Sequence, residues 1–345
     1  QAFGLVSVFL LGAFDHFAVM IRRLSLILPG VLALCNDNSS VPCVQLPHGV
    51  QMPMVALGSW RGSYKDCANN NYSCAQEHAR HAVQSWLQSL GGTHVDTAND
   101  YRTQVQVGEA LKASGLSREQ VFVTTKCPGA IGFNATLQCI EDNIQMLGFY
   151  SEEKPYIDLV LVHFPFAVKP ECNGVTGGAE CDPAYYDPGA EVRRSTWAAM
   201  EFALRMGRVR AIGVSNYQVK HLLEIQDFAE MPAVNQVEWH PYHHDDEVKA
   251  FCDTHGIAVE AWSPLSGQNA SALSDPTVKE VASKHNVSTA QVVLRWSLQQ
   301  NVSVVVGTEK VDHMKTDLEV FSFHLTDSEM QSISKLRSSS QEVFV

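Results

Sequence analysis

Four polar side chains that could together protonate a carbonyl group lie at or near the ends of predicted strands. Asp96, Lys126 and His163 each close an apolar, β-rich run, and Tyr101 follows Asp96 by five residues. A cationic lysine beside a tyrosine hydroxyl favours the phenolate, so Lys126 would lower the pKa of Tyr101. Asp96 would neutralise and position that buried lysine. A tyrosine tuned in this way can protonate a carbonyl oxygen while a hydride arrives at the carbon.

The elements that must position these residues alternate regularly along the chain. The expected strands are residues 55–59, 93–98, 121–126, 158–164, 210–216, 233–239, 256–262 and 302–308. The expected helices are residues 74–90, 103–114, 134–147, 191–206, 219–228, 245–254 and 289–299. Such alternation implies parallel strands joined by crossover helices. Eight units in about 250 residues favour a closed (β/α)8 TIM barrel. An open dinucleotide-binding sheet would need a GxGxxG after a strand, and none occurs.

A barrel would bring the four residues together, because the C-terminal ends of its strands face one common site. Residues 44–50 predict an N-terminal β-hairpin with a Pro-His-Gly turn, which could close the bottom of the barrel. The longest irregular stretch, residues 166–189, follows the fourth strand and would lie at the mouth. We therefore expect one barrel domain over residues 41–337 and a short tail over 338–345.

Length and charge exclude several classes of protein. With 345 residues the chain can bury enough apolar surface to fold without a metal or disulfide, as one barrel with extras or as two domains. Its composition excludes collagen, coiled coil and general disorder. The formal net charge of −12 argues against nucleic acid or an anionic membrane surface as the main partner.

The N-terminal segment, residues 1–35, is mostly apolar. Asp15 and two arginines interrupt it, which disfavours a membrane-spanning helix. Starting at Met20, it has a short basic region, an apolar core over residues 24–34 and then polar residues, which is typical of a signal peptide. A buried or membrane-anchoring N-terminal helix is the alternative. On the signal-peptide interpretation, the mature chain would have no stable membrane span.

Glycosylation sequons support a secretory interpretation. Chance predicts roughly two Asn-x-Ser/Thr sequons in a chain of this composition. Six occur, at Asn38, Asn71, Asn134, Asn269, Asn286 and Asn301. We expect the secretory pathway, either the endoplasmic reticulum lumen or the exterior, with a cytoplasmic location as the alternative.

The cysteine count points the same way. If Cys35 is removed with the leader, eight of the nine cysteines remain, an even number. Two pairs, Cys67 with Cys74 and Cys172 with Cys181, bracket short loops of the kind that disulfides close. None has the spacing of a zinc site, so no metal is expected. Unpaired buried thiols in a cytosolic enzyme are the alternative.

Six motifs along the chain point beyond single residues to a family. They are DTANDY at 96–101, VTTK at 123–126, LVHFP at 161–165, IGVSN at 212–216, NQVEWHPY at 235–242 and AWSPL at 261–265. In this order they resemble the signatures of the aldo-keto reductases, over about residues 43–337. The resemblance implies Tyr101 as general acid, Lys126 as the residue that tunes its pKa, Asp96 as the partner of Lys126, and His163 as the group that orients the substrate carbonyl.

The resemblance also implies a nicotinamide cofactor and a small aldehyde or ketone as substrate. Trp262 would stack on the nicotinamide where the family usually has tyrosine, and Trp60 and Phe164 would line the substrate pocket. The other cofactor-binding residues implied are Ser215, Asn216 and Gln236 at the carboxamide, Ser263 and Leu265 at the pyrophosphate, and Gly307, Thr308, His313 and Asp317 beyond them. We expect NADPH, with NADH use open, and a monomer.

Three departures from the family bear on these assignments. Gln104 stands where the family usually has glutamate. Gly307 and His313 stand where the family has cations that clamp the 2′-phosphate of NADP. Lys310 and His313 could still supply positive charge, but Glu309 opposes it, which leaves NADH possible. The segment after Leu325 is short, which predicts an open, permissive pocket and prevents naming the substrate.

Two other functions compete with carbonyl reduction. A nucleotide-binding regulatory protein with little turnover would keep the barrel and the cofactor, but it would not need all four catalytic residues. A secreted barrel hydrolase would need paired carboxylates, for which Asp96 and Glu260 are candidates. Glu260 does not end its strand, however, and Lys126 would then have no role.

Overall fold

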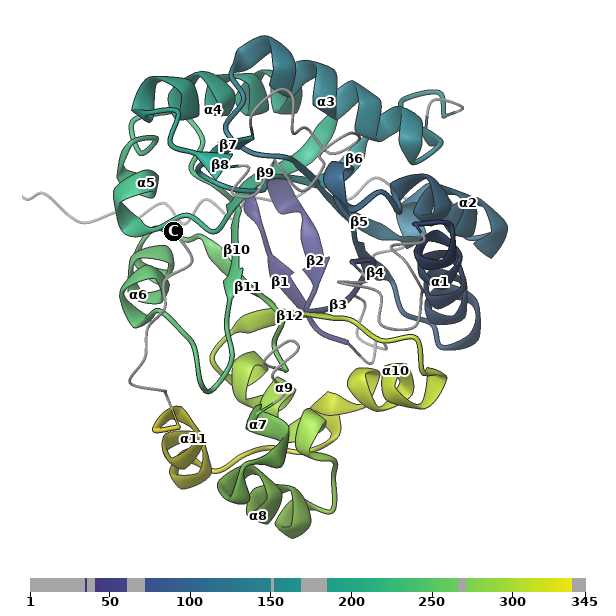
Figure 1. Ribbon diagram of the computed structural model, residues 1–345, viewed down its shortest axis with the longest axis vertical. Coiled ribbons are helices and arrows are strands. Elements are labelled where there is room, and N and C mark those ends of the chain that lie inside the picture. Colours follow the sequence, from purple (N-terminus) through teal and green to yellow (C-terminus); the bar gives the residue numbers. More distant parts are fainter. Residues whose placement is uncertain are drawn as a thin grey trace, which may run out of the picture. The chain divides into compact units, whose positions relative to one another are not determined.

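A closed barrel of eight parallel strands forms the centre of the chain (Figure 1). The structure is a computed structural model that describes residue 35 and residues 41–60, 72–149, 152–168, 185–265 and 271–336. Around the barrel the strands follow the order β10-β11-β12-β3-β4-β5-β6-β9. The barrel strands are β3 (Val55–Gly58), β4 (His94–Asp96), β5 (Phe122–Cys127), β6 (Ile157–Val162), β9 (Val209–Ser215), β10 (Val234–Glu238), β11 (Ala258–Trp262) and β12 (Val302–Val306). The predicted (β/α)8 barrel is therefore confirmed.

Helices surround the strands in Figure 1. They are α1 (Tyr72–Gln84), α2 (Gln104–Ser114), α3 (Phe133–Met146), α4 (Ala190–Arg205), α5 (Val219–Leu223), α6 (Asp246–Thr254), α7 (Ser271–Ser274), α8 (Pro276–His285), α9 (Thr289–Gln299), α10 (Val311–Leu318) and α11 (Asp327–Ser334). Short helical turns are η1 (Pro47–Gly49), η3 (Ser85–Ser89), η4 (Asn99–Tyr101), η5 (Arg118–Gln120) and η10 (Val320–Ser322). Side chains at helix starts fix several boundaries: Asp245 accepts hydrogen bonds from the backbone of α6, and Ser288 and Gln291 form a capping box at α9.

The N-terminal hairpin closes one end of the barrel, as expected. Strands β1 (Cys43–Gln45) and β2 (Gln51–Pro53) pair antiparallel, and His48 and Gly49 take positive φ in the turn between them. Figure 1 shows this hairpin, in purple, across the centre of the ring of strands. Met52 belongs to one buried apolar cluster with Phe122 and Leu159 of the barrel strands. Because the hairpin covers this apolar end, the polar interior lies towards the other end.

Some boundaries differ from those expected. The helix expected over 219–228 ends at Leu223, and the one over 74–90 becomes a π turn from Ser85. Helices α7, α8, α10 and α11 and the small pair β7 (Ala167–Val168) and β8 (Tyr185–Tyr186) were not predicted. Within the described ranges, no helix has the length and apolar character needed to cross a membrane. The predicted leader, apart from Cys35, and the tail 338–345 lie outside the described residues.

The cysteine pairing differs from the sequence-based expectation. Cys35 is bonded to Cys43, with 5.9 Å between their Cα atoms, a pair that the sequence did not predict. Cys127 and Cys139 form a second disulfide, which spacing alone did not suggest because β5 and α3 come together only in the fold. Cys252 is a buried free thiol, so the expected set of eight paired cysteines, which included Cys252 and left out Cys35, does not hold.

Two predicted disulfide loops are only partly visible. Cys74 is disulfide-bonded, while Cys67 lies outside the described residues. The predicted pair Cys172 and Cys181 also lies outside them.

A buried ion cluster anchors the start of β6. The carboxylate of Asp158, whose side chain is 1% exposed, forms ion pairs with Arg118 and, at 2.7 Å, with Arg210. It also accepts a hydrogen bond from the backbone N–H of Val123 at 2.9 Å. Three donors from different segments thus depend on one carboxylate.

We expect Asp158→Ala to lower the free energy of unfolding by about 3 kcal/mol, because it leaves the buried Arg118 guanidinium without its partner. Urea unfolding followed by circular dichroism measures the change. The control is Asp253→Ala, which removes an exposed pair with Lys249 on α6 and should change stability by about 0.5 kcal/mol or less. Equal unfolding midpoints for the two variants would contradict the prediction.

Candidate active site

A buried ammonium group lies at the centre of the candidate site. Lys126, at the end of β5, is fully buried, and its Nζ donates to both carboxylate oxygens of Asp96 at 2.7 and 2.8 Å. It also lies 3.0 Å from the backbone oxygen of Thr97 and 3.2 Å from the hydroxyl oxygen of Tyr101. Burial lowers the pKa of Lys126, but Asp96 and Tyr101 outweigh this effect and hold it above its usual value. The lysine is therefore a fixed cation that donates to the tyrosine.

Tyr101 accepts this hydrogen bond on its oxygen. Its own O–H is therefore left to donate elsewhere. Burial raises the pKa of Tyr101 above its usual value, and Lys126 lowers it by a smaller amount. The expected lowering thus holds for the contribution of Lys126 alone, because the loss of solvent around the phenol has the larger effect. In this state Tyr101 is a protonated phenol.

His163, at the end of the β6 segment, is held beside Tyr101. Its Nδ1 lies 3.1 Å from Oδ1 of Asp100, and its ring meets that of Tyr101 edge-on at 5.5 Å between centroids. Burial raises the pKa of Asp100, but the interactions with His163 and Lys126 outweigh this and bring it below the usual value. The pair fixes the imidazole ring, which leaves Nε2 as the nitrogen available to a substrate oxygen.

Aromatic rings border this group. The ring of Trp60 lies 5.1 Å from that of Tyr101, and its side chain is 54% exposed. Phe164 stacks on His163 at 4.5 Å. Both residues predicted to line the substrate pocket are thus in contact with the catalytic candidates.

Residues expected at the nicotinamide carboxamide and ring form a connected set on β9, β10 and β11 and in the residue after β9. The Ser215 hydroxyl donates to the backbone oxygen of Gln236 at 2.8 Å. Asn216 takes a positive φ, donates from Nδ2 to the backbone oxygen of His163 at 3.0 Å and accepts from the indole N–H of Trp262 at 2.9 Å. A flat indole fixed beside amide groups fits a planar ring that carries a carboxamide, so these residues are compatible with a nicotinamide.

The residues expected along the rest of the cofactor are more dispersed. Ser263 takes a positive φ and Leu265 is partly buried, after the end of β11. Gly307 and His313 are exposed, and Thr308 accepts a hydrogen bond from the backbone of Lys310. Burial raises the pKa of Asp317, on α10, to about 7.

A histidine that the sequence did not single out reaches this region. His78, on α1, pairs with Glu309. The carboxylate of Glu309, next to Thr308, therefore has a partner from α1.

Two carboxylates considered for hydrolysis do not form a hydrolytic pair. Asp96 is occupied by Lys126 on both oxygens, and Glu260 is fully buried and bonded to Gln236. No group of three His, Cys, Asp or Glu side chains among the described residues is suited to hold a metal ion.

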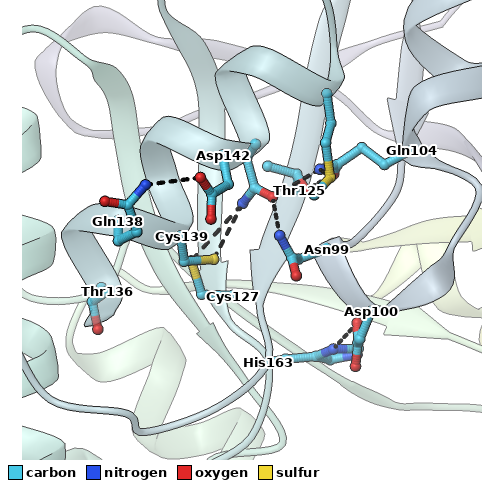
Figure 2. The surroundings of a disulfide bond; sticks show 12 residues. Asn99, Asp100, Gln104, Thr125, Cys127, Thr136, Gln138, Cys139, Asp142 and His163 are labelled. Atoms are coloured by element: carbon cyan, nitrogen blue, oxygen red, sulfur yellow. Dashed lines mark hydrogen bonds and ion pairs between the residues drawn. A yellow bond between two sulfur atoms is a disulfide. The ribbon is translucent and has the colours of Figure 1, made fainter. Parts of the chain in front are cut away.

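A buried amide network supports the turn that carries Tyr101. Oδ1 of Asn143, on α3, accepts from Nδ2 of Asn99 at 2.9 Å and from Nε2 of Gln104 at 2.7 Å. Its Nδ2 donates weakly to both sulfurs of the Cys127–Cys139 disulfide, at 3.8 and 3.6 Å. Figure 2 shows this network around the disulfide. Asn99 begins η4, so the network fixes the start of the segment with Asp100 and Tyr101.

Sequence reasoning did not identify Asp100, Asn143 or the role of Gln104 in this network. Asn143 left one signal: it is a polar residue among the buried positions Cys139, Ile140 and Ile144 of a predicted helix. Gln104 was noted only as a replacement of glutamate. As an amide it both donates to Asn143 and accepts from Thr125, which a carboxylate could not do.

Comparisons with known proteins agree with this geometry. The model of the "Aldo/keto reductase family" matches residues 55–338. The chain is 35% identical over 306 residues to the 9,11-endoperoxide prostaglandin H2 reductase of Trypanosoma cruzi, covering 88% of this chain and 92% of that protein. It is 34% identical to the glyoxal reductase of Bacillus subtilis, covering 85% and 92%.

Solved structures show the same similarity. The crystal structure of an aldo/keto reductase from Brucella melitensis superimposes with a TM-score of 0.71 at 32% identity. The match covers 86% of this chain and 99% of that one. The similarity therefore extends over nearly the whole described barrel.

We expect Asn143→Ala to destabilise the protein by about 2 kcal/mol, because it removes the oxygen that accepts hydrogen bonds from the amide groups of both Asn99 and Gln104. Urea unfolding measures the effect. Gln138→Ala is the control, since Gln138 is exposed on the same helix and its side chain bonds only Asp142 among the described residues, so a change within about 0.5 kcal/mol is expected. An Asn143→Ala variant as stable as this control would show that the network carries little of the stability.

Proposed function

The chain belongs to the aldo-keto reductase family, and from this premise we propose that it reduces the carbonyl group of a small aldehyde or ketone, with Tyr101 as proton donor. One observation carries the proposal. The hydroxyl oxygen of Tyr101 accepts a hydrogen bond from the buried Lys126 ammonium, so the phenol proton is free to point at a substrate oxygen.

Each of the four catalytic candidates has a separate role in the proposed reaction. His163, held by Asp100, donates from Nε2 to the carbonyl oxygen and orients it towards Tyr101. As negative charge develops on that oxygen, the phenol proton moves to it and an alcohol forms. The phenolate left behind is stabilised by Lys126, whose own charge is balanced by Asp96.

A reduced nicotinamide supplies the hydride when it is bound. Ser215, Asn216 and Gln236 would hold its carboxamide and Trp262 its ring. Ser263, Leu265, Gly307, Thr308, His313 and Asp317 would line the rest of the cofactor.

We propose NADPH on the basis of the family resemblance, with NADH as an alternative. Gly307 and His313 provide no lysine or arginine for the 2′-phosphate, and Glu309 is close in sequence. The ratio of rates with the two cofactors decides between them.

We propose small aldehydes, including dicarbonyls such as glyoxal, as the first substrates to test. The B. subtilis relative is named for glyoxal reduction. Trp60, the pocket residue most open to solvent, would cover such a substrate without enclosing it.

We further propose that the chain enters the secretory pathway, carries N-linked glycans and acts as a monomer. Among the described sequons, Asn134, Asn286 and Asn301 are all exposed, as glycan acceptors must be. Treatment of protein secreted by eukaryotic cells with an N-glycosidase should lower its apparent mass.

We expect Tyr101→Phe to reduce kcat for glyoxal by at least about 100-fold with either cofactor, because it removes the proton donor. Oxidation of NADPH and NADH, followed by absorbance, measures the rates. Tyr156→Phe is the control. Tyr156 precedes the first residue of β6, at the end of that strand opposite His163, and its ring stacks on Arg118, so kcat should not change.

Quenching of tryptophan fluorescence by the cofactor shows whether the variant still binds it. Binding without turnover in the unaltered chain, over a panel of aldehydes and ketones, would favour the regulatory alternative. Turnover that survives Tyr101→Phe would exclude Tyr101 as the proton donor.

A further inference from the structure

A second buried carboxyl group lies next to the catalytic candidates and has no part in the mechanism above. Glu260, in the middle of β11, is fully buried. Its Oε2 accepts a hydrogen bond from Nε2 of Gln236 at 2.7 Å. Its Oε1 has no hydrogen-bond partner among the described residues. A buried carboxyl group with one oxygen that makes no hydrogen bond lowers the stability of the fold, so its presence needs an explanation.

Gln236 connects Glu260 to the catalytic group. The same Nε2 lies 2.9 Å from Oδ2 of Asp96. Two carboxyl oxygens face this end of the amide, so it must be the NH₂ end, because an oxygen there would be repelled by both. Gln236 therefore has its Oε1 available to other donors. Its side chain links Glu260 to Asp96, and Asp96 holds Lys126.

The charges around Glu260 come from few elements. On the adjacent strands, the residues in register with Glu260 are the neutral Gln236 of β10 and Ser303 of β12. Across the interior, the charged groups that act on it are Asp96 and Lys126. Burial, and then repulsion by Asp96, raise the pKa of Glu260 to about 7, although Gln236 and Lys126 act in the opposite direction.

The net charge of this cluster therefore changes near neutral pH. While Glu260 is protonated, Asp96 and Lys126 balance each other. When Glu260 ionises, one negative charge is added within a buried site, where charges are poorly screened. That charge disfavours a phenolate on Tyr101, and a phenol with a higher pKa is a weaker proton donor.

We propose that Glu260 is a positioning residue of the carbonyl reduction: it fixes the Gln236 amide and, through its own proton, sets the charge around Lys126 and so the readiness of Tyr101 to donate. This role rests on the proposed function. It adds a group that controls the reaction without touching the substrate.

The test compares Glu260→Gln with Glu201→Gln. The first keeps the shape and an acceptor for Gln236 but cannot ionise. The second makes the same change on α4, where Oε1 of Glu201 accepts from the backbone N–H of Glu230 at 2.8 Å and the carboxylate pairs with Arg205. Neither partner changes its charge between pH 5 and 8.5. Both unfolding and turnover are measured from pH 5 to 8.5.

Unfolding by urea tests the ionisation itself without any substrate. In the folded chain Glu260 keeps its proton up to about pH 7, whereas in the unfolded chain it loses it near its ordinary value of 4.5. The contribution of the protonated group is therefore present at low pH and lost as the pH rises through this window. The urea concentration at the unfolding midpoint of Glu260→Gln, relative to that of the unaltered chain, should rise between pH 5 and 7.5 and stay constant above pH 7.5. Glu201→Gln should differ by a constant amount over the same range, because its partners keep their charge there.

Turnover tests the link to Tyr101. The ratio of kcat for Glu260→Gln to kcat for the unaltered chain should rise about threefold or more from pH 5.5 to 8.5, with its midpoint near 7. The ratio for Glu201→Gln should not depend on pH. A purely structural role would give Glu260→Gln a constant ratio as well.

The outcomes of the two measurements distinguish failure of the Glu260 proposal from failure of the proposed function. A stability difference that does not vary with pH would overturn the ionisation of Glu260, and with it the proposal. A varying stability difference with a constant kcat ratio would overturn the link to Tyr101. Absence of turnover in the unaltered chain would overturn the proposed function and any role of Glu260 in it, while the unfolding data would still decide where Glu260 ionises.

Discussion

The ion pair of Lys126 with Asp96 is the constraint on which the rest of the site depends. A buried ammonium without a partner would be strongly destabilising, so the barrel interior must supply a carboxylate in contact with it. Once Asp96 is fixed in this way, its second oxygen can also accept from Gln236. The ammonium's remaining contacts go to the Thr97 backbone and to Tyr101. One electrostatic requirement thus orders residues from β4, β5 and β10.

The barrel interior has an apolar end and a polar end, and the polar end holds the buried ion pair. At one end, hairpin residues such as Met52 pack with Phe122 and Leu159, so that end is apolar. Towards the other end, polar side chains are bonded to one another. His94 illustrates the boundary: burial lowers its pKa to about 4, and the neutral ring bonds the backbone oxygen of Pro53 and the Thr124 hydroxyl. The hairpin therefore covers the polar side chains of the interior where they meet the apolar end, at His94.

Sequence reasoning found the residues at strand ends because one rule of barrel geometry applies to all of them. Asp96, Lys126 and His163 needed only the position of each strand. The rule says nothing about a side chain that acts from the middle of a strand, such as Glu260, or from an outer helix, such as Asn143. Glu260 is 24 positions from Gln236, and Asn143 is 44 positions from Asn99 and 39 from Gln104, so no spacing signals these contacts. The Cys127–Cys139 disulfide was not predicted for the same reason, since these two cysteines meet only where α3 covers β5.

The raised pKa of Tyr101 limits how this site can work. A phenol that holds its proton in the resting state cannot act by ionising before the substrate arrives. It can act only when a substrate oxygen becomes more basic than the phenolate, which happens as the hydride is transferred. The ammonium of Lys126 then stabilises negative charge that is absent from the ground state, and such selective stabilisation is what lowers a barrier. Groups that alter the charge around Lys126 therefore act on the transition state more than on binding.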